Sequence, residues 1–420
     1  MTDTRLYLTS IYDICRPVSK EEFSANLDDD AIYSRSEPQP PHQPTRIYLD
    51  QDNSLYRDRT RYNPSGFKPL FEHYYGPQKT FLAHFREALV LHDGMTVVAA
   101  CNQVVFPGEK DEVPPTHLIE KYINRSAMSY CIRKTGPGEV VEWEHYLKSP
   151  PVTTPYYFIE QPHVLLSCVG QIKYHSFMFD IISRLWIYEE WPELREYPVL
   201  VPPMGEQFEQ ALADAIGIPR SQLAVIPPSA TARFGFRHLV LPSALGDRMV
   251  TKRQLTLMRE RVAPGIGPRP GHPRRRIYLS RCDRPHRTCA NEAEVVTMLQ
   301  TYGFETVVGA DLSLQEQAQL FSETEMLVGI SGSGFTNMIY MQPGSVALEM
   351  TQRDEEPLGN GITAETAVVC DLHHLIVTSE WNIEVLPRGV MAQKPFVPTS
   401  MLYDLDRLRE AVEAGIALLN

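Results

Sequence analysis

The chain has 420 residues, enough for two or three domains, and its 43% hydrophobic and 22% charged residues are ordinary for a soluble globular protein. The formal net charge of -12 argues against a nucleic-acid partner, because binding phosphates usually needs a basic face. Seven scattered cysteines without paired spacings predict reduced thiols. No window approaches about 18 apolar residues, so no transmembrane segment is expected. We expect a cytoplasmic protein, and attachment at the periphery of an inner membrane stays open.

Residues 1–80 hold few regular patterns. They contain an acidic run at 28–30 and a Pro-rich stretch at 36–44, S-E-P-Q-P-P-H-Q-P, which cannot lie inside a helix. We expect an irregular N-terminal arm that belongs to the first domain.

Residues 81–262 carry patterns typical of an open α/β domain. An amphipathic helix is predicted over 81–90, and a strand or bent hairpin arm over 96–106. After these, strands are predicted at 156–159, 164–168, 198–201, 223–226 and 238–241, and helices at 174–188, 206–216 and 251–262. The rhythm of strands and helices predicts a first Rossmann-like domain.

A Pro- and Gly-rich stretch at 263–273, A-P-G-I-G-P-R-P-G-H-P, is the best linker in the chain. We place the domain boundary there, so the second domain covers 274–420. Within it, short links join strands at 277–279, 305–308 and 326–330 to helices that begin after Asn291 and after Ser313. Ser313 and Glu316 have the spacing of a capping box. This alternation predicts a second parallel, Rossmann-like sheet, which binds ligands beyond the carboxyl ends of its strands.

Two groups at those strand ends are suited to an anion. Gly332, Ser333 and Gly334 precede a predicted helix at 335–341, where backbone amides can approach an anion and Ser333 and Thr336 can add hydroxyl donors. The alternative is a simple tight turn. Seven arginines also fall within nineteen residues. Arg281 and Arg287 are the candidates for ligand contact, whereas the arginines at 274–276 are better explained as a solvated linker.

Several motifs in the second half together resemble the nucleotide-binding domain of glycosyltransferase family 61. They are I-Y-L-S-R (277–281), R-T-C-A-N-E-A-E-V (287–295), Y-G-F-E (302–305), L-S-L-Q-E-Q (312–317), G-I-S-G-S-G-F-T-N (329–337) and M-Q-P-G-S-V-A-L-E-M (341–350). In the first half, K-Y-H-S-F-M-F-D-I-I-S-R-L (173–185) is similar to the Tyr-His and Asp helix of that family. The resemblance implies a GT-B fold, in which two Rossmann-like domains face each other across a cleft. It further implies a nucleotide-sugar donor, a glycan or lipid-linked acceptor, inversion at the anomeric carbon, and neither a metal nor another cofactor.

The resemblance also implies where the donor lies. It places the donor near the following residues: Arg281, Arg287, Asn291, Glu292, Ser331, Gly332, Ser333, Gly334, Thr336, Asn337 and Glu349. Asn291 and Glu292 have the alternative role of a helix cap and its dipole partner. Glu349 is expected to end a strand, where it could bond ribose hydroxyls or be solvated.

An inverting transfer needs a group that takes the proton of the acceptor hydroxyl, and we expect Asp180 or His175. The two are five residues apart, so on a regular helix they diverge by about 140°, whereas the family spacing is four. His175 could still reach the site from the helix start. Asp180 could instead form an ion pair with Arg184.

A second departure from the family is Ile330-Ser331, where Pro-His is usual. Either an arginine supplies the missing positive charge, the donor differs, or activity is lost. A non-catalytic sugar- or nucleotide-binding partner protein therefore stands beside the transferase as a hypothesis. A dehydrogenase is disfavoured, because no G-x-G-x-x-G follows the first strand.

Metal sites are weaker alternatives. Cys282, His286 and Cys289 supply three zinc-type ligands but no adjacent fourth. Asp404 and Asp406 begin a predicted helix, where acids cap and favour the dipole. His373 and His374 fit either the acceptor side or ordinary surface. The sequence is compatible with a homo-oligomer and does not name the sugar, nucleotide or acceptor.

Overall fold

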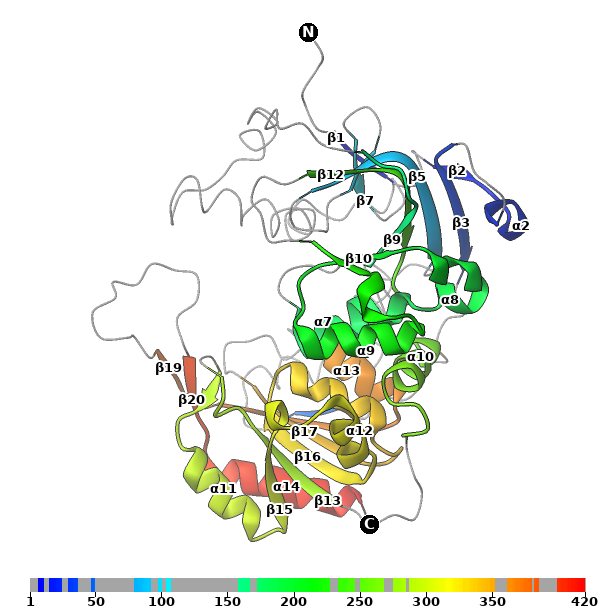
Figure 1. The fold of residues 1–420 in the computed structure, drawn as a ribbon. Coiled ribbons are helices and arrows are strands. Elements are labelled where there is room, and N and C mark those ends of the chain that lie inside the picture. Colours follow the sequence, from blue (N-terminus) through cyan, green and yellow to red (C-terminus); the bar gives the residue numbers. More distant parts are fainter. Residues whose placement is uncertain are drawn as a thin grey trace. The chain divides into compact units, whose positions relative to one another are not determined.

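The computed structural model describes residues 7–10, 15–24, 29–36, 47–49, 79–91, 97–99, 103–106, 158–166, 172–226, 233–245, 250–267, 275–284, 287–351, 361–379, 381–384 and 399–419. The chain forms two compact units. Unit 1 contains residues 1–37 and 79–247, and unit 2 contains residues 38–78 and 248–420. The chain therefore passes between the units after residues 37, 78 and 247, and the two are described separately (Figure 1).

Unit 1 is built on one mixed sheet of eleven strands in the described part of the chain. The strands are β1 (Tyr7–Ser10), β2 (Arg16–Pro17), β3 (Ala31–Ser36), β5 (Lys79–Leu91), β6 (Val97–Ala99), β7 (Gln103–Phe106), β8 (Phe158–Ile159), β9 (His163–Leu165), β10 (Val199–Val201), β11 (Leu223–Val225) and β12 (Arg233–Pro242). The main order is β1-β7-β6-β5-β12-β9-β10-β11. The run from β12 to β11 is parallel, as predicted, whereas β3, β5, β6, β7 and β12 form antiparallel pairs that the sequence pattern did not reveal.

The helix predicted over 81–90 is wrong, because this stretch lies within the long strand β5. Phe81, Ala83 and Phe85 face the core with a period of two, and the pattern resumes at Ala88 and Val90. The phase changes at Glu87, whose φ of 61° distorts the strand. The resulting spacing of 81, 85 and 88 imitates one face of a helix. Antiparallel pairing with β3 and β12 on its two sides fixes the segment as a strand.

The helices of unit 1 are mostly short. They are α2 (Lys20–Phe23), α7 (Tyr174–Ser176), the π-helix η3 (Phe177–Ile181), the 3-10 helix η4 (Ile182–Arg184), α8 (Ile187–Glu190), the 3-10 helix η5 (Pro192–Glu196), α9 (Glu206–Ile216) and the 3-10 helix η6 (Arg220–Gln222). The single helix predicted over 174–188 is thus broken into segments of different pitch. The helix predicted at 206–216 is confirmed, and it ends at Gly217, whose φ of 83° suits a glycine C-cap.

Unit 2 contains a six-stranded sheet in which every described pair is parallel. Its strands are β4 (Ile47–Leu49), β13 (Arg275–Ser280), β15 (Phe304–Val308), β16 (Thr324–Ile330), β17 (Val346–Thr351) and β18 (His373–Thr378), in the order β15-β13-β16-β17-β18-β4. A separate three-stranded sheet contains β14 (Thr288–Cys289), β19 (Trp381–Glu384) and β20 (Thr399–Leu402). The parallel sheet predicted for this half of the chain is confirmed.

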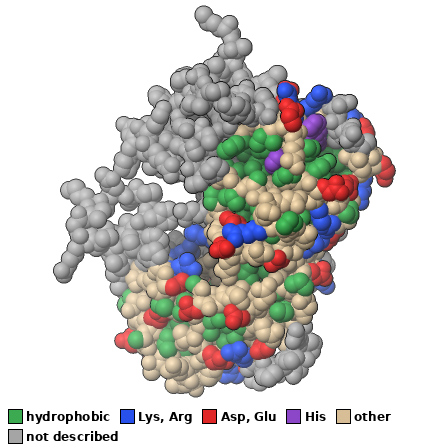
Figure 2. Space-filling view, viewed as in Figure 1, with side chains coloured by type: hydrophobic (Ala, Val, Ile, Leu, Met, Phe, Trp, Pro, Cys, Tyr) green, Lys and Arg blue, Asp and Glu red, His purple; other side chains and the backbone are tan. Residues whose placement is uncertain are grey.

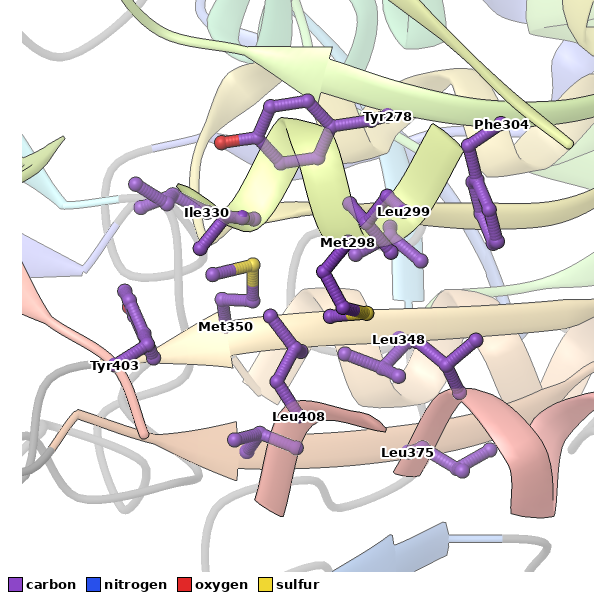
Figure 3. Close-up of a cluster of buried hydrophobic side chains, with 14 of the residues drawn as sticks. Tyr278, Met298, Leu299, Phe304, Ile330, Leu348, Met350, Leu375, Tyr403 and Leu408 are labelled. Atoms are coloured by element: carbon purple, nitrogen blue, oxygen red, sulfur yellow. The ribbon is translucent and has the colours of Figure 1, made fainter. Parts of the chain in front are cut away.

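Helices cover both faces of the parallel sheet (Figure 1). They are α10 (Lys252–Val262), α11 (Glu292–Gln300), the 3-10 helix η7 (Gly309–Asp311), α12 (Leu314–Ser322), the 3-10 helix η8 (Ser333–Tyr340), α13 (Gly361–Val369) and α14 (Leu405–Leu418). Figure 3 shows the core between the sheet and the pair α11 and α14, where Met298 and Leu408 pack on Leu348 and Met350. The capping box at Ser313 and Glu316 is present, as predicted. Among the described residues, no helix is long and apolar enough to span a bilayer.

The two compact units have different boundaries from the domains predicted from the sequence. The division falls at residues 247 and 248, before α10, whereas the predicted linker follows this helix. Arg259 of α10 donates to the carbonyl of Ile339 in η8, which ties the helix to unit 2. Strand β4, which lies within the expected irregular arm, pairs with β18 of unit 2. Most of the Pro-rich stretch falls outside the described residues.

Candidate functional site

The order of the strands in unit 2 identifies the site. Strands β13 and β16 are neighbours in the sheet. The chain leaves β13 toward β15 on one side, and it leaves β16 toward β17 on the other side, so the two connections diverge. In an open α/β sheet, ligands bind at such a switch point, beyond the carboxyl ends of the strands. Arg281 follows β13 there, and Ser331 and Gly332 follow β16.

Arg281 and Gly332 are in direct contact at this point. A Cβ atom on residue 332 would lie 2.1 Å from Nη1 of Arg281, so the guanidinium occupies the space that any side chain would need. The backbone of Gly332 is extended, with a φ of 166°, so its conformation does not require glycine, but a side chain here would displace the guanidinium of Arg281. Gly334 is constrained in the same way, because its Cβ would lie 2.4 Å from Cδ2 of Leu279.

Arg287 links the two loops. Its Nη1 donates to the carbonyl of Ser331 at 3.3 Å, and its own carbonyl accepts from Nε of Arg281 at 3.3 Å. Its φ of 54° is uncommon for a residue other than glycine, and such conformations cluster at functional sites. Arg281, Arg287, Ser331 and Gly332 therefore form one connected group, named here the switch-point group.

The switch-point group is cationic. Burial, and then the positive charges of Arg287 and Arg284, lower the pKa of Arg281 to about 10, while Asp283 acts in the opposite direction. Arg281 stays charged at neutral pH. A partly buried guanidinium beside a second one is stabilised by an anion, because charge-assisted hydrogen bonds compensate for lost hydration.

Helix η8 adds backbone donors next to this group. Gly332 caps the helix and contributes its carbonyl to the amide of Phe335 at 3.0 Å. The first amides of a helix, here those of Ser333 and Gly334, have no acceptor within the helix and carry partial positive charge. Ser333 and Gly334 are partly exposed, so these amides are placed to meet a ligand.

Asn291 and Glu292 are held by bonds within unit 2. The Asn291 side chain bonds the carbonyl of Tyr403 at 2.9 Å and its amide at 3.2 Å. Oε1 of Glu292 accepts from Tyr278 at 3.0 Å and from Ser280 at 2.7 Å. Asn291 occupies the N-cap position of α11 without a side-chain cap bond. These contacts show that both residues fix the loop after β13.

Three other residues that were predicted to contact the donor are buried in η8 or just before it. Ser331, Thr336 and Asn337 are almost fully buried, and Nδ2 of Asn337 donates to Oε1 of Gln317 at 3.0 Å. These side chains join η8 to the rest of unit 2. Ser331 contributes its backbone carbonyl to the switch-point group.

The sequence pattern predicted that Glu349 ends its strand, but β17 continues to Thr351. Its side chain is 2% exposed and lies 2.9 Å from Nε2 of His374, which is 1% exposed. Oε2 of the carboxylate is paired with the neighbouring strand, whereas Oε1 of Glu349 and Nδ1 of His374 are buried without a hydrogen-bond partner in the described part of the chain. Of the two alternatives for His374, ordinary surface is excluded, because the side chain is 1% exposed.

His175 and Asp180 lie in unit 1, on α7 and η3. The ring of His175 stacks on Phe179 with centroids 4.7 Å apart, and burial lowers the pKa of His175 to about 4. The imidazole is therefore neutral at pH 7. Arg184, the suggested ionic partner of Asp180, donates through Nε to the carbonyl of Asp180 at 2.6 Å and also to the carbonyl of Pro242.

The remaining sequence candidates have structural explanations. Arg275 pairs with Glu305, and Arg276 with Glu325, both at 2.9 Å and at the amino end of β13. Figure 2 shows such mixing of basic and acidic side chains over the visible surface. Asp404 caps α14 by accepting from the amides of residues 406 and 407, as predicted. Within the described ranges no three His, Cys, Asp or Glu side chains are placed to hold a metal ion, and His286 lies outside those ranges.

Fold and site together define an α/β protein with a cationic group at the switch point of a parallel sheet. Residues 174–348 match the family model described as Glycosyltransferase 61, which supports membership of this glycosyltransferase family. The matched region begins at the helix that carries His175 and Asp180 and ends within β17, so it includes the switch-point group. No curated protein matches the chain in sequence.

Proposed function

We propose that the protein is an inverting, metal-independent glycosyltransferase of GT-B architecture, which moves a sugar from a nucleotide-sugar donor to a hydroxyl of a glycan or lipid-linked acceptor. We further propose a role in bacterial polysaccharide biosynthesis. The contact between Arg281 and Gly332 at the switch point is the observation that carries the donor assignment. Family membership supports a sugar donor and an acceptor.

The switch-point group has the chemistry that a departing nucleoside diphosphate needs. When the bond to the sugar breaks, negative charge grows on the diphosphate, and preorganised cations and amides stabilise that charge. Arg281 and Arg287 supply two cations, and the start of η8 supplies amides. In this proposal these groups take the place of a divalent metal ion.

Arg287 also bears on the missing histidine of the family. At the position of that histidine the chain has Ser331, whose carbonyl accepts from Nη1 of Arg287. This contact favours the alternative in which an arginine supplies the positive charge. The other two alternatives for Ser331 are loss of activity and a different donor, and the donor screen and transfer assay below test them.

On the acceptor side, we propose that His175 or Asp180 takes the proton of the acceptor hydroxyl. A neutral imidazole can accept a proton, and burial keeps His175 neutral at pH 7. Its low pKa makes His175 a weak base. Asp180, which is partly exposed, is the alternative base. The pH dependence of the transfer rate distinguishes the two assignments. Replacement of the residue that acts as the base should remove the acid limb of this profile, and replacement of the other residue should leave it.

A thermal-shift screen with UDP-, GDP-, CMP- and TDP-sugars tests the donor assignment, because a ligand that binds only the folded state raises the melting temperature. We expect at least one donor to raise it, and Arg281→Ala to abolish that rise. Arg275→Ala is the matched control, since Arg275 lies at the other end of β13, away from the switch point, and its guanidinium pairs with Glu305 of β15. An unchanged rise in Arg281→Ala would remove this residue from the donor site.

Ser331 motivates a second candidate, a sugar- or nucleotide-binding protein of the same fold without catalytic activity. Transfer or hydrolysis of a labelled nucleotide sugar by the purified protein would exclude it. Binding without turnover, across donors and acceptors, would support it over the transferase.

A further inference from the structure

The helix between His175 and Arg184 changes pitch twice within a few residues. It begins as α7, becomes the π-helix η3 and ends as the 3-10 helix η4. At the end of the π segment, the amide of Ile182 donates to the carbonyls of Met178 and Phe177, four and five residues earlier. Single π turns inside helices occur mostly at functional sites.

This change of pitch alters how His175 and Asp180 relate. On a regular α-helix, residues five apart diverge by about 140°. In a π turn the backbone bonds join residues five apart, so each residue advances by less than the α-helical 100°. Asp180 lies inside the π segment, so we expect the angle between His175 and Asp180 to be smaller than on a regular α-helix.

The π turn leaves carbonyl groups that side chains then satisfy. Oγ of Ser183 donates to the carbonyl of Phe179, and Nε of Arg184 donates to that of Asp180 at 2.6 Å. Nη1 of Arg184 donates in addition to the carbonyl of Pro242, at the end of β12. Arg184 thus joins the backbone of Asp180 to the central strand of unit 1.

Further bonds tie the same segment to residues after β12. The amide of Leu245 donates to the carbonyl of Ser183 at 3.1 Å, and Nε1 of Trp186 donates to the carbonyl of Ser243 at 2.9 Å. Ser183, Trp186 and Leu245 are fully or nearly fully buried. The π turn is therefore anchored to the sheet from several sides and is not a frayed helix end.

We propose that the π turn is a built change of helical register and that Arg184 is a positioning residue, which holds Asp180 and His175 in working geometry through the backbone. This inference rests on the proposed function of those two residues as the site of proton transfer. Phe179, whose carbonyl is bonded by Ser183 and whose ring stacks on His175, is the link through which the turn orients the imidazole.

Arg184→Met tests the proposal, because it keeps an apolar stem and removes the donors. Arg195→Met is the matched control, since Arg195 also donates to a carbonyl of unit 1, that of Ile216 at 2.9 Å, but lies outside the π turn. We expect Arg184→Met to lower kcat about tenfold to a hundredfold with little change in the donor KM, since small misplacements of reacting groups have effects of this size. Arg184→Lys should restore part of the rate.

Hydrogen exchange of the peptide that covers 177–184 separates this inference from the proposed function. We expect faster exchange there in Arg184→Met and unchanged exchange in Arg195→Met. If the wild-type protein transfers no sugar but this exchange pattern is found, the proposed function fails and the anchoring role of Arg184 stands. Exchange and kcat in Arg184→Met equal to those of the wild type would overturn the positioning role.

Discussion

The guanidinium of Arg281 lies where the side chain of residue 332 would otherwise be, with Nη1 only 2.1 Å from the position of a Cβ atom. The guanidinium can occupy this position between the loop after β13 and the loop after β16 because residue 332 is glycine. The two loops bring cationic and amide groups together at the one place in the sheet where neighbouring connections diverge.

Gly332→Ala should displace Arg281, because the added methyl group and Nη1 cannot occupy the same volume. We expect binding of the donor to weaken about tenfold or more while the protein stays folded, as measured by titration calorimetry and circular dichroism. Gly267→Ala is the control, since a Cβ there meets nothing within 4 Å and no unusual φ is required. Equal affinity in the two variants would show that Arg281 can move aside without loss.

His175 should make the protein less stable in mild acid. Its pKa is lowered from 6.5 to about 4 by burial, so between pH 6.5 and 4 the unfolded chain binds a proton that the folded chain does not. Stability is then lost as the pH falls through this window, by ~3 kcal/mol in total. Urea unfolding at pH 7 and pH 4.5 measures the effect. In His175→Leu this part of the pH dependence should vanish, and its persistence would assign it to other groups.

Breaking the Glu349 and His374 pair should be strongly destabilising, because removal of one partner leaves the other buried without compensation. Glu349→Ala is expected to cost about 3–5 kcal/mol, whereas the double replacement Glu349→Leu with His374→Phe should be far milder. Arg409→Ala, which breaks the exposed pair with Asp406, should cost less than about 1 kcal/mol. A double-mutant cycle by chemical denaturation measures the coupling. If the effects of the two single replacements were additive, Glu349 and His374 would have no net interaction in the folded protein.

Ser313→Ala removes the side-chain acceptor of the capping box of α12. We expect a loss of about 1 kcal/mol in the free energy of unfolding. Donor affinity should change little, because Ser313 follows β15 at the end of the described strand order, whereas the switch-point group follows β13 and β16. A large change in affinity would mean that α12 shapes the donor site.

The sequence predicted unit 2 well because its signals are local. Capping at Ser313, the short apolar strands and the glycines after β16 all specify structure within a few residues. Arg281 was identified from its place after a strand, and the structure puts it beside Gly332. That contact depends on the pairing of β13 with β16, which periodicity cannot show.

The failures have physical causes of longer range. Strand β5 has a helix-like spacing of apolar residues because Glu87 breaks its alternation, and pairing with β3 and β12 overrides that local pattern. The π turn at 177–181 also lacked a clear signal, since its carbonyl partners Ser183 and Arg184 resemble ordinary surface positions of a helix. Glu349 looked like a strand end because the length of β17 is set by its neighbours β16 and β18.

Strand β4 has a practical consequence for anyone who divides this protein. It comes from residues 47–49, yet it lies at the edge of the parallel sheet beside β18, while residues 79–247 between them belong to the other unit. A fragment that starts at Arg248 would lack this strand and would present the unpaired edge of a largely buried strand, which is a template for aggregation. Exchange of unit 2 between relatives therefore requires two segments to be transplanted together, and a single crossover would give a chain with one strand missing.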